Sequence, residues 1–145
     1  MTEPAPNDTT RRFRSAVITT FPAAHSLHGL PGDSEVARSH GHDYRATFVF
    51  ETTTLVYPGV VIDDRVRAEI TEHVDTHLAY RDLDQLFDRP ATCEAIAEHL
   101  ANWFARSAGP AGTAWLVSVA VTAGSGDHGE IHLPHPGQSS APRSR

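Results

Sequence analysis

Two stretches of alternating side chains constrain the fold of this chain most strongly. In residues 13–21, one set of side chains occupies the odd-numbered positions from Phe13 to Phe21. In residues 42–51, the even-numbered positions carry the aromatic and other less polar side chains. A period of two places one set of side chains on a single face of a strand. Each stretch therefore predicts a β-strand that is buried on one face and exposed on the other.

The segments that follow have the spacing of helices. Three apolar residues at intervals of four come after Asp63, whose carboxylate can cap a first turn, and this predicts a helix over residues 64–78. A second helix is expected to begin near Thr92 and to end by Gly109, and alternation returns in residues 115–121. The order strand, strand, helix, helix, strand is typical of an α+β domain with helices packed on one face of an antiparallel sheet.

The composition excludes several classes of protein. The 145 residues carry a net charge of −6 and include no Lys, so we expect no nucleic-acid partner. No apolar run approaches the roughly 20 residues of a membrane span and no leader segment is recognisable, so we expect no membrane partner and a cytoplasmic protein. The lone Cys93 excludes an internal disulfide. Polar, Pro-containing ends predict disordered tails at 1–10 and 134–145 around one domain at 11–133.

Three histidines are the candidate metal ligands. His40 and His42 stand two apart at the start of the second predicted strand, so their rings project from the same face. His25 follows the first predicted strand, and antiparallel pairing could bring it beside the other two. Three imidazoles that leave one coordination position open are typical of a catalytic Zn²⁺ site. Taken alone, the pair is also compatible with a chance arrangement on a polar strand end.

The chain resembles the 6-pyruvoyl- and 6-carboxy-tetrahydropterin synthase family over roughly residues 12–122. The resemblance is carried by three motifs in the family's order: Phe21-Pro22-Ala23-Ala24-His25, His40-Gly41-His42-Asp43-Tyr44 and Gly59-Val60-Val61-Ile62-Asp63. It implies the T-fold, in which three subunits join their sheets into a barrel and two trimers often stack into a hexamer. It also implies zinc on the three histidines, a small-molecule substrate and active sites between subunits.

Three motifs of the family are altered in this chain. Val36 stands where the family has a nucleophile-like Cys, four residues before the histidine pair. The family's Asp-His dyad corresponds to Ala79 and Tyr80. Its pterin-binding Glu corresponds to Val121, so a pterin would leave buried ring donors unsatisfied there. Together these changes indicate a reaction other than the family's usual one.

We therefore expect a diverged zinc-dependent lyase or cyclase of natural-product biosynthesis. Its substrate would be an oxygenated, apolar, non-pterin molecule that undergoes dehydration or elimination, with cyclisation as a further possibility. The candidate catalytic residues are Tyr80, in the former histidine position, and Glu94, in a segment that resembles the family's P-T-x-E. The candidate substrate-binding residues are Val36, Ser39, Val121 and Thr122.

Two alternatives remain open at this point. The chain could be a tetrahydropterin synthase that uses a replacement base, for example Glu35 or Ser39. It could also be a zinc-containing protein that binds a small molecule without catalysis, because all three proton-transfer positions are replaced. Both candidate catalytic residues also have a purely structural interpretation. Tyr80 could be a packed aromatic residue, and Glu94 could be an acid that favours the helix dipole.

Other polar residues are interpreted as structural. His73 and His77, four apart near the end of the first helix, are expected to stabilise its C-terminal dipole from the surface rather than to bind a metal. The segment 127–132, with its two acids and two histidines, is interpreted as a solvated loop. Nothing in the sequence places Cys93 beside the metal.

Overall fold

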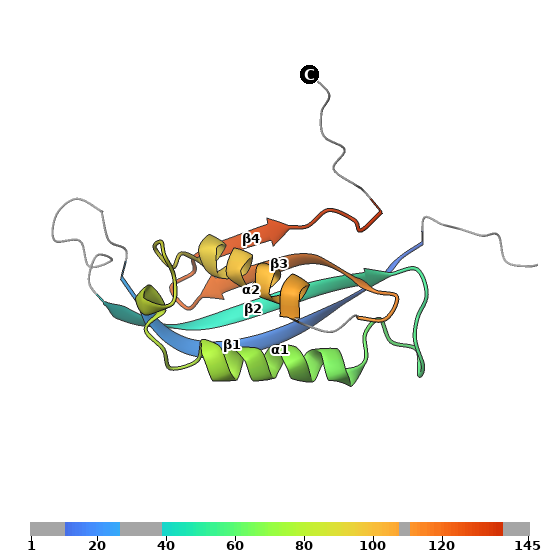
Figure 1. Cartoon of the computed structure of the whole chain (residues 1–145), viewed down its shortest axis with the longest axis horizontal. Coiled ribbons are helices and arrows are strands. Elements are labelled where there is room, and N and C mark those ends of the chain that lie inside the picture. The colour runs from blue at the N-terminus through green and yellow to red at the C-terminus, as the bar shows by residue number, and fades with distance from the viewer. Residues whose placement is uncertain (1–10, 27–38, 108–110, 138–145) are drawn as a thin grey trace, which may run out of the picture.

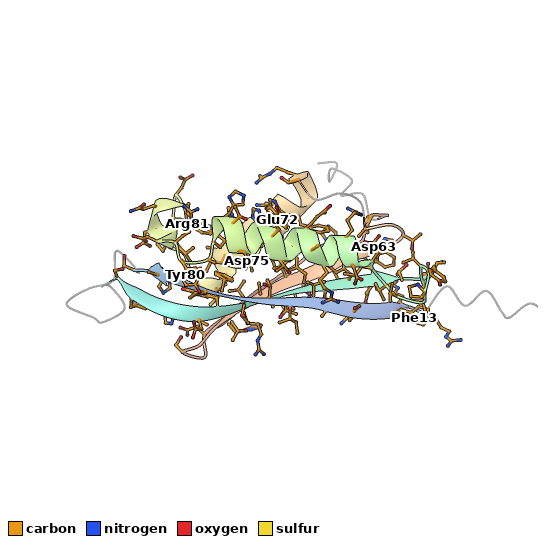
Figure 2. The ribbon with its side chains drawn as sticks, turned by 90° about the horizontal axis from the view of Figure 1, so that it is seen from below. Phe13, Asp63, Glu72, Asp75, Tyr80 and Arg81 are labelled. Carbon is orange, nitrogen blue, oxygen red and sulfur yellow. The ribbon has the colours of Figure 1, made fainter. Side chains whose placement is uncertain are left out.

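A computed structural model describes residues 11–26, 39–107 and 111–137. The described residues form an α+β fold with a four-stranded antiparallel sheet in the order β1-β2-β3-β4, as the sequence predicts for the class. The strands are β1 (Phe13–His25), β2 (His40–Thr52), β3 (Trp115–Ala123) and β4 (His128–His132). Two helices, α1 (Asp64–His77) and α2 (Cys93–Ser107), lie over one face of this sheet (Figures 1 and 2).

The alternation in β1 and β2 sets the face of the sheet that is buried. Phe21 pairs with Tyr44 and Val17 pairs with Phe48 in the register of the two strands, and all four side chains are buried. Their neighbours in sequence point to the opposite face, which no helix of the described residues covers (Figure 2). The core therefore lies between the helices and one face of the sheet.

Both helices begin with a capping side chain, and the cap by Asp63 was predicted from sequence. The Asp63 carboxylate accepts from the Val66 amide at 3.2 Å, and the Thr92 hydroxyl accepts from the Ala95 amide at 3.1 Å. The buried side of α1 consists of the three residues spaced by four: Val66, Ile70 and Val74. None of the helices among the described residues is long and apolar enough to cross a membrane.

The solvated loop expected over residues 127–132 is wrong, because most of this segment forms the edge strand β4. Gly129 and Ile131 face the helices, whereas His128, Glu130 and His132 are exposed. Since one inward position is a glycine, the apolar alternation is too weak to identify the strand from sequence. The closing strand expected at 115–121 is therefore an interior strand, β3, and β4 lies at the edge (Figure 1).

His73 is half-buried, rather than fully exposed on the surface as was expected. Its ring stacks on Trp103 of α2 with centroids 3.8 Å apart and planes 9° from parallel. Burial, followed by the neighbouring His77 and His99, lowers the pKa of His73 from 6.5 to about 4. His73 is therefore uncharged at neutral pH and cannot stabilise a helix dipole as a cation, whereas the exposed His77 does lie in the last turn.

The predicted tails lie largely outside the described residues. Of the C-terminal segment, residues 134–137 are described: His135 packs edge-on against Trp115, with ring centroids 4.5 Å apart. The Gly137 amide donates to the Nδ1 atom of His135 at 2.9 Å.

Candidate metal centre and the adjoining cavity

The structure brings the three candidate metal ligands together at one end of the sheet. His25 is the last residue of β1 and pairs in register with His40, the first residue of β2, while His42 lies one pleat further along β2. One nitrogen from each ring lies within 4.8 Å of the others. The ring centroids of the three pairs are 4.5, 5.0 and 4.6 Å apart. The cluster could therefore hold a metal ion.

Hydrogen bonding of His25 fixes which nitrogen faces the cluster. Its Nδ1 atom lies 2.7 Å from the carbonyl oxygen of Ala91, so Nδ1 carries the proton and donates it. Its Nε2 atom, which is left with a free lone pair, lies 2.9 Å from Nε2 of His40. Two nitrogens that share a tetrahedral zinc ion at about 2.0–2.1 Å stand roughly 3.3 Å apart, so the His25–His40 pair needs to separate by only a few tenths of an ångström to share the ion. The donor set thus fits zinc.

The segment after α1 holds His25 in place. The Asp84 carboxylate accepts from the Ser26 amide at 2.9 Å and from the Ser26 hydroxyl at 2.6 Å. The Ala24 amide donates to the carbonyl of Arg81 at 3.0 Å. These bonds flank His25 on both sides, so the backbone that carries its ring is anchored independently of any metal.

A cavity of about 230 Å³ opens beside the imidazoles. The N-terminus of α2 and the turn between β3 and β4 contribute to its wall, together with β1 and β2. The residues most relevant to its chemistry are His25, His42, Cys93, Glu94, Ala123 and Asp127.

The charge of Asp127 acts on the groups around this cavity. Burial, followed by the neighbouring His25 and His40, lowers the pKa of His42, and Asp127 opposes this shift. Asp127 also contributes to the raised pKa values of Tyr44 and Cys93. Asp127 was predicted to lie in a solvated loop, because only the β3–β4 pairing brings it to the candidate metal centre.

Cys93 is a second residue whose place in the site sequence reasoning missed. Its thiol is 7% exposed and lies 3.7 Å from the carbonyl oxygen of Asp127, to which it donates. Burial is the largest cause of the raised pKa of Cys93, and Glu94 and Asp127 add to it. The thiol therefore stays protonated at neutral pH, although it lines the cavity beside His25 and His42.

The predicted catalytic residues occupy two different cavities. Glu94 lines the cavity of the metal centre, in the first turn of α2. Tyr80 is 87% exposed and lines a separate cavity of about 480 Å³, which shares His42 with the first. Its backbone has a φ of 61°, and its amide donates to the carbonyl of Pro22 at 2.7 Å. Figure 2 shows Tyr80 just beyond the C-terminal end of α1.

The predicted substrate-binding residues are dispersed. Val36 lies outside the described residues, and Ser39 is exposed immediately before His40. Val121 is 0% exposed and belongs to the core under the helices. Thr122 points to the other face of the sheet, where its hydroxyl lies 2.8 Å from the Nδ1 atom of His128. His128 also lines the cavity beside His25 and His42.

Comparison with known proteins agrees with this geometry. The family model of 6-pyruvoyl tetrahydropterin synthase matches residues 15–126. No curated protein matches the chain.

Solved structures show the same fold at low sequence identity. The Caenorhabditis elegans 6-pyruvoyl tetrahydropterin synthase is 19% identical, with a TM-score of 0.71 over 86% of this chain and 97% of its own. The uncharacterized protein WS1659 from Wolinella succinogenes is 13% identical, with a TM-score of 0.70 over 86% and 99%. A Plasmodium vivax 6-pyruvoyltetrahydropterin synthase, described as a catalytic residue mutant with Cys in place of Glu, is 14% identical, with a TM-score of 0.53 over 85% and 98%. The fold is thus the T-fold of these enzymes, and the chain belongs to the 6-pyruvoyl tetrahydropterin synthase family.

Proposed function

We propose that this chain is a zinc-dependent carbon–oxygen lyase that acts on an oxygenated, non-pterin small molecule with an apolar body. One observation carries the proposal: three convergent imidazoles adjoin a cavity lined by two carboxylates, Glu94 and Asp127. The family's pterin-binding Glu is replaced by Val121, which is fully buried and offers no acceptor to a pterin ring. The site thus combines metal-binding capacity with acid–base groups.

His25, His40 and His42 are the residues that would hold zinc. A zinc ion with an open position acts as a Lewis acid that polarises a substrate oxygen. The Ala91 carbonyl fixes the tautomer of His25, and the Asp84–Ser26 hydrogen bonds fix its backbone. Such outer interactions orient a ligand before the metal arrives.

Glu94 and Asp127 are the groups proposed to move protons in the cavity. In the elimination of water, one carboxylate removes a proton from the carbon next to the carbonyl, and the electron pair of that C–H bond forms the C=C bond. The neighbouring C–O bond breaks, and the leaving hydroxyl takes up the proton that the carboxylate removed and departs as water. Cys93 is not the base in this proposal, because its raised pKa keeps the thiol protonated.

Tyr80 is a candidate proton donor from the larger cavity. Its side chain and His42 line the same space, so a substrate in that cavity could contact both. The phenol is also the replacement for the family's dyad histidine. We assign Tyr80 a role at the outer end of the substrate, since its cavity does not include Glu94 or Asp127 in its wall.

Self-association into trimers or hexamers and a role in natural-product biosynthesis belong to the same proposal. Among the described strands, β1 and β4 are the two edges of the sheet, and edges of this kind pair with other chains unless they are covered. We place the enzyme in the cytoplasm. A metal centre without the family's pterin-binding Glu would suit the dehydration or cyclisation of a larger natural-product precursor.

A tetrahydropterin synthase with a replacement base is the second candidate. The Plasmodium vivax structure supports it, because the residue replaced in that enzyme is a catalytic Glu. In this chain Glu35 immediately precedes Val36, although both lie outside the described residues. A zinc-containing binding protein without activity is the third possibility, and it is supported only by the three replaced positions.

The test uses the zinc-loaded protein with two kinds of substrate. We expect no product from dihydroneopterin triphosphate, and we expect β-hydroxy ketones or thioesters to lose water faster than with an equal concentration of free zinc. The conjugated product is followed by its ultraviolet absorbance. Conversion of the pterin would favour the second candidate, and dehydration no faster than with free zinc across the panel would favour the binding protein.

Matched variants then identify the acid–base groups. Glu94→Gln and Asp127→Asn are each expected to slow dehydration by about 100-fold or more, in line with the loss of a general acid or base. Glu98→Gln is the control, because Glu98 lies one turn further along α2, where it forms an ion pair with Arg89 away from the cavity. Equal rates for all three variants would contradict the assigned roles.

A further inference from the structure

A second pair of histidines lies on α1, outside the metal centre already described. His73 and His77 are one helical turn apart, and their ring centroids are 4.8 Å apart. Both line a cavity of about 230 Å³, whose wall also includes Glu69, Glu72 and Trp103. None of these residues takes part in the proposed lyase chemistry.

The spacing of the two rings matches the spacing of imidazoles that share a metal ion. With metal–nitrogen bonds of about 2.0–2.1 Å, two imidazoles on one ion hold their ring centres roughly 4.5–5.2 Å apart. The three pairs within the His25–His40–His42 cluster span 4.5–5.0 Å. The ring-centre distance of the His73–His77 pair lies inside both ranges.

His73 is prepared for a ligand in three respects. Its Nε2 atom is buried and has no hydrogen-bond partner. Its ring is held flat against the indole of Trp103, so its orientation does not depend on a metal. Burial also lowers the pKa of His73 to about 4, so its ring is neutral at neutral pH. A neutral imidazole is the form that coordinates metals.

We propose that His73 and His77 form a second divalent transition-metal site, which is independent of the proposed active site. Imidazole ligands favour the later first-row ions, Ni²⁺, Cu²⁺ and Zn²⁺. The remaining positions would be filled by water and by a carboxylate of the cavity. Glu69 lies one turn before His73 in the same cavity wall and forms an ion pair with Arg65 at 2.8 Å.

This site is expected to bind a metal ion more weakly than the strand cluster, which consists of His25, His40 and His42. Among the described residues, only His25, His40 and His42 bring three potential ligands within 4.8 Å of one another. The helical pair supplies two imidazoles that are already in position. A bound ion would link two successive turns of α1 close to its contact with α2.

Trp103 provides a direct readout of this site. The chain has two tryptophans, and Trp115→Phe leaves Trp103 as the remaining indole. The Trp115→Phe protein is first loaded with one equivalent of zinc to fill the strand cluster, and is then titrated with Ni²⁺. We expect saturable quenching of Trp103 fluorescence, because the ion would be coordinated by His73, whose ring stacks on the indole.

Variants in the same background decide the proposal. His77→Ala is expected to raise the Ni²⁺ concentration at half-quenching at least tenfold, and since His77 is exposed the helix content measured by circular dichroism should be unchanged. His132→Ala, which removes an exposed histidine from β4, is expected to change that concentration less than twofold. Non-saturable quenching, or the same midpoint in His77→Ala as in its parent, would overturn the proposal.

Discussion

His25 donates its Nδ1 proton to the carbonyl oxygen of Ala91 across 2.7 Å, and this bond joins the end of β1 to the segment just before α2. The two residues are 66 positions apart in the sequence. Because the bond commits Nδ1 as a donor, it leaves Nε2 of the same ring to face His40. The strand cluster is thus shaped for a metal by hydrogen bonds that the protein makes without one.

Asp84 should affect zinc binding although it is not a ligand. Its carboxylate holds the Ser26 amide and hydroxyl, next to His25. We expect Asp84→Ala to weaken zinc affinity about tenfold, the lower end of the effect of removing an outer-shell partner. A competition titration with a chromophoric chelator measures the affinity. The exposed Asp88 provides the control. An Asp88→Ala protein that loses as much zinc affinity as Asp84→Ala would contradict the role of Asp84 in holding the backbone beside His25.

Gly129 should be intolerant of any side chain. A Cβ atom at this position would overlap backbone atoms of Cys93 and Glu94, so β4 could not keep its distance from the N-terminus of α2. We expect Gly129→Ala to lower the free energy of unfolding by about 1–3 kcal/mol, as overpacking does elsewhere. Chemical denaturation measures this change.

Gly41→Ala is the matched control for that measurement. A Cβ atom at Gly41 would come no closer than 3.9 Å to the carbonyl oxygen of Ala23, which is an ordinary contact. We expect a clearly smaller loss of stability from it. If the two variants unfolded at the same denaturant concentration, the close approach of β4 to α2 would be refuted.

Cys93 should react slowly with alkylating reagents at neutral pH. Its pKa is raised above the ordinary 9.0, mainly by burial, so at any given pH the folded protein holds less thiolate than a free thiol does. We expect carboxamidomethylation by iodoacetamide at pH 7.5 to be at least about tenfold slower than for glutathione, and to accelerate as the pH rises past 9. Mass spectrometry follows the reaction.

Protein unfolded in urea supplies the comparison for that experiment. There Cys93 should react at the rate of an ordinary thiol, since burial no longer raises its pKa. Rapid alkylation of the folded protein at pH 7.5 would instead mark Cys93 as an activated thiolate and a replacement for the family's cysteine.

Sequence patterns predicted those parts of the fold that depend on local periodicity. The strands around Phe21 and Tyr44 and the helix that buries Val66 were predicted because each buries one regular face. Strand β4 was missed because Gly129 offers no apolar side chain at an inward position.

The site was only partly predictable, for a related reason. His25, His40 and His42 were identified by strand spacing and by resemblance to the family. Asp127 and Cys93 reach the cavity only through the packing of the β3–β4 turn against the N-terminus of α2, a long-range contact that no local pattern encodes. The stack of His73 on Trp103 is likewise a contact between two helices, so its effect on the pKa could not be read from α1 alone.

The zinc content of matched histidine variants shows whether His25, His40 and His42 hold a metal ion together. Wild-type protein and the variants His42→Ala and His132→Ala are loaded with excess zinc, dialysed against a weak chelator and analysed by atomic emission. We expect about one zinc ion per chain in the wild type and in His132→Ala, and far less than one in His42→Ala, because two imidazoles hold zinc less tightly than three. A His42→Ala protein that retains as much zinc as the wild type would contradict the assigned metal centre.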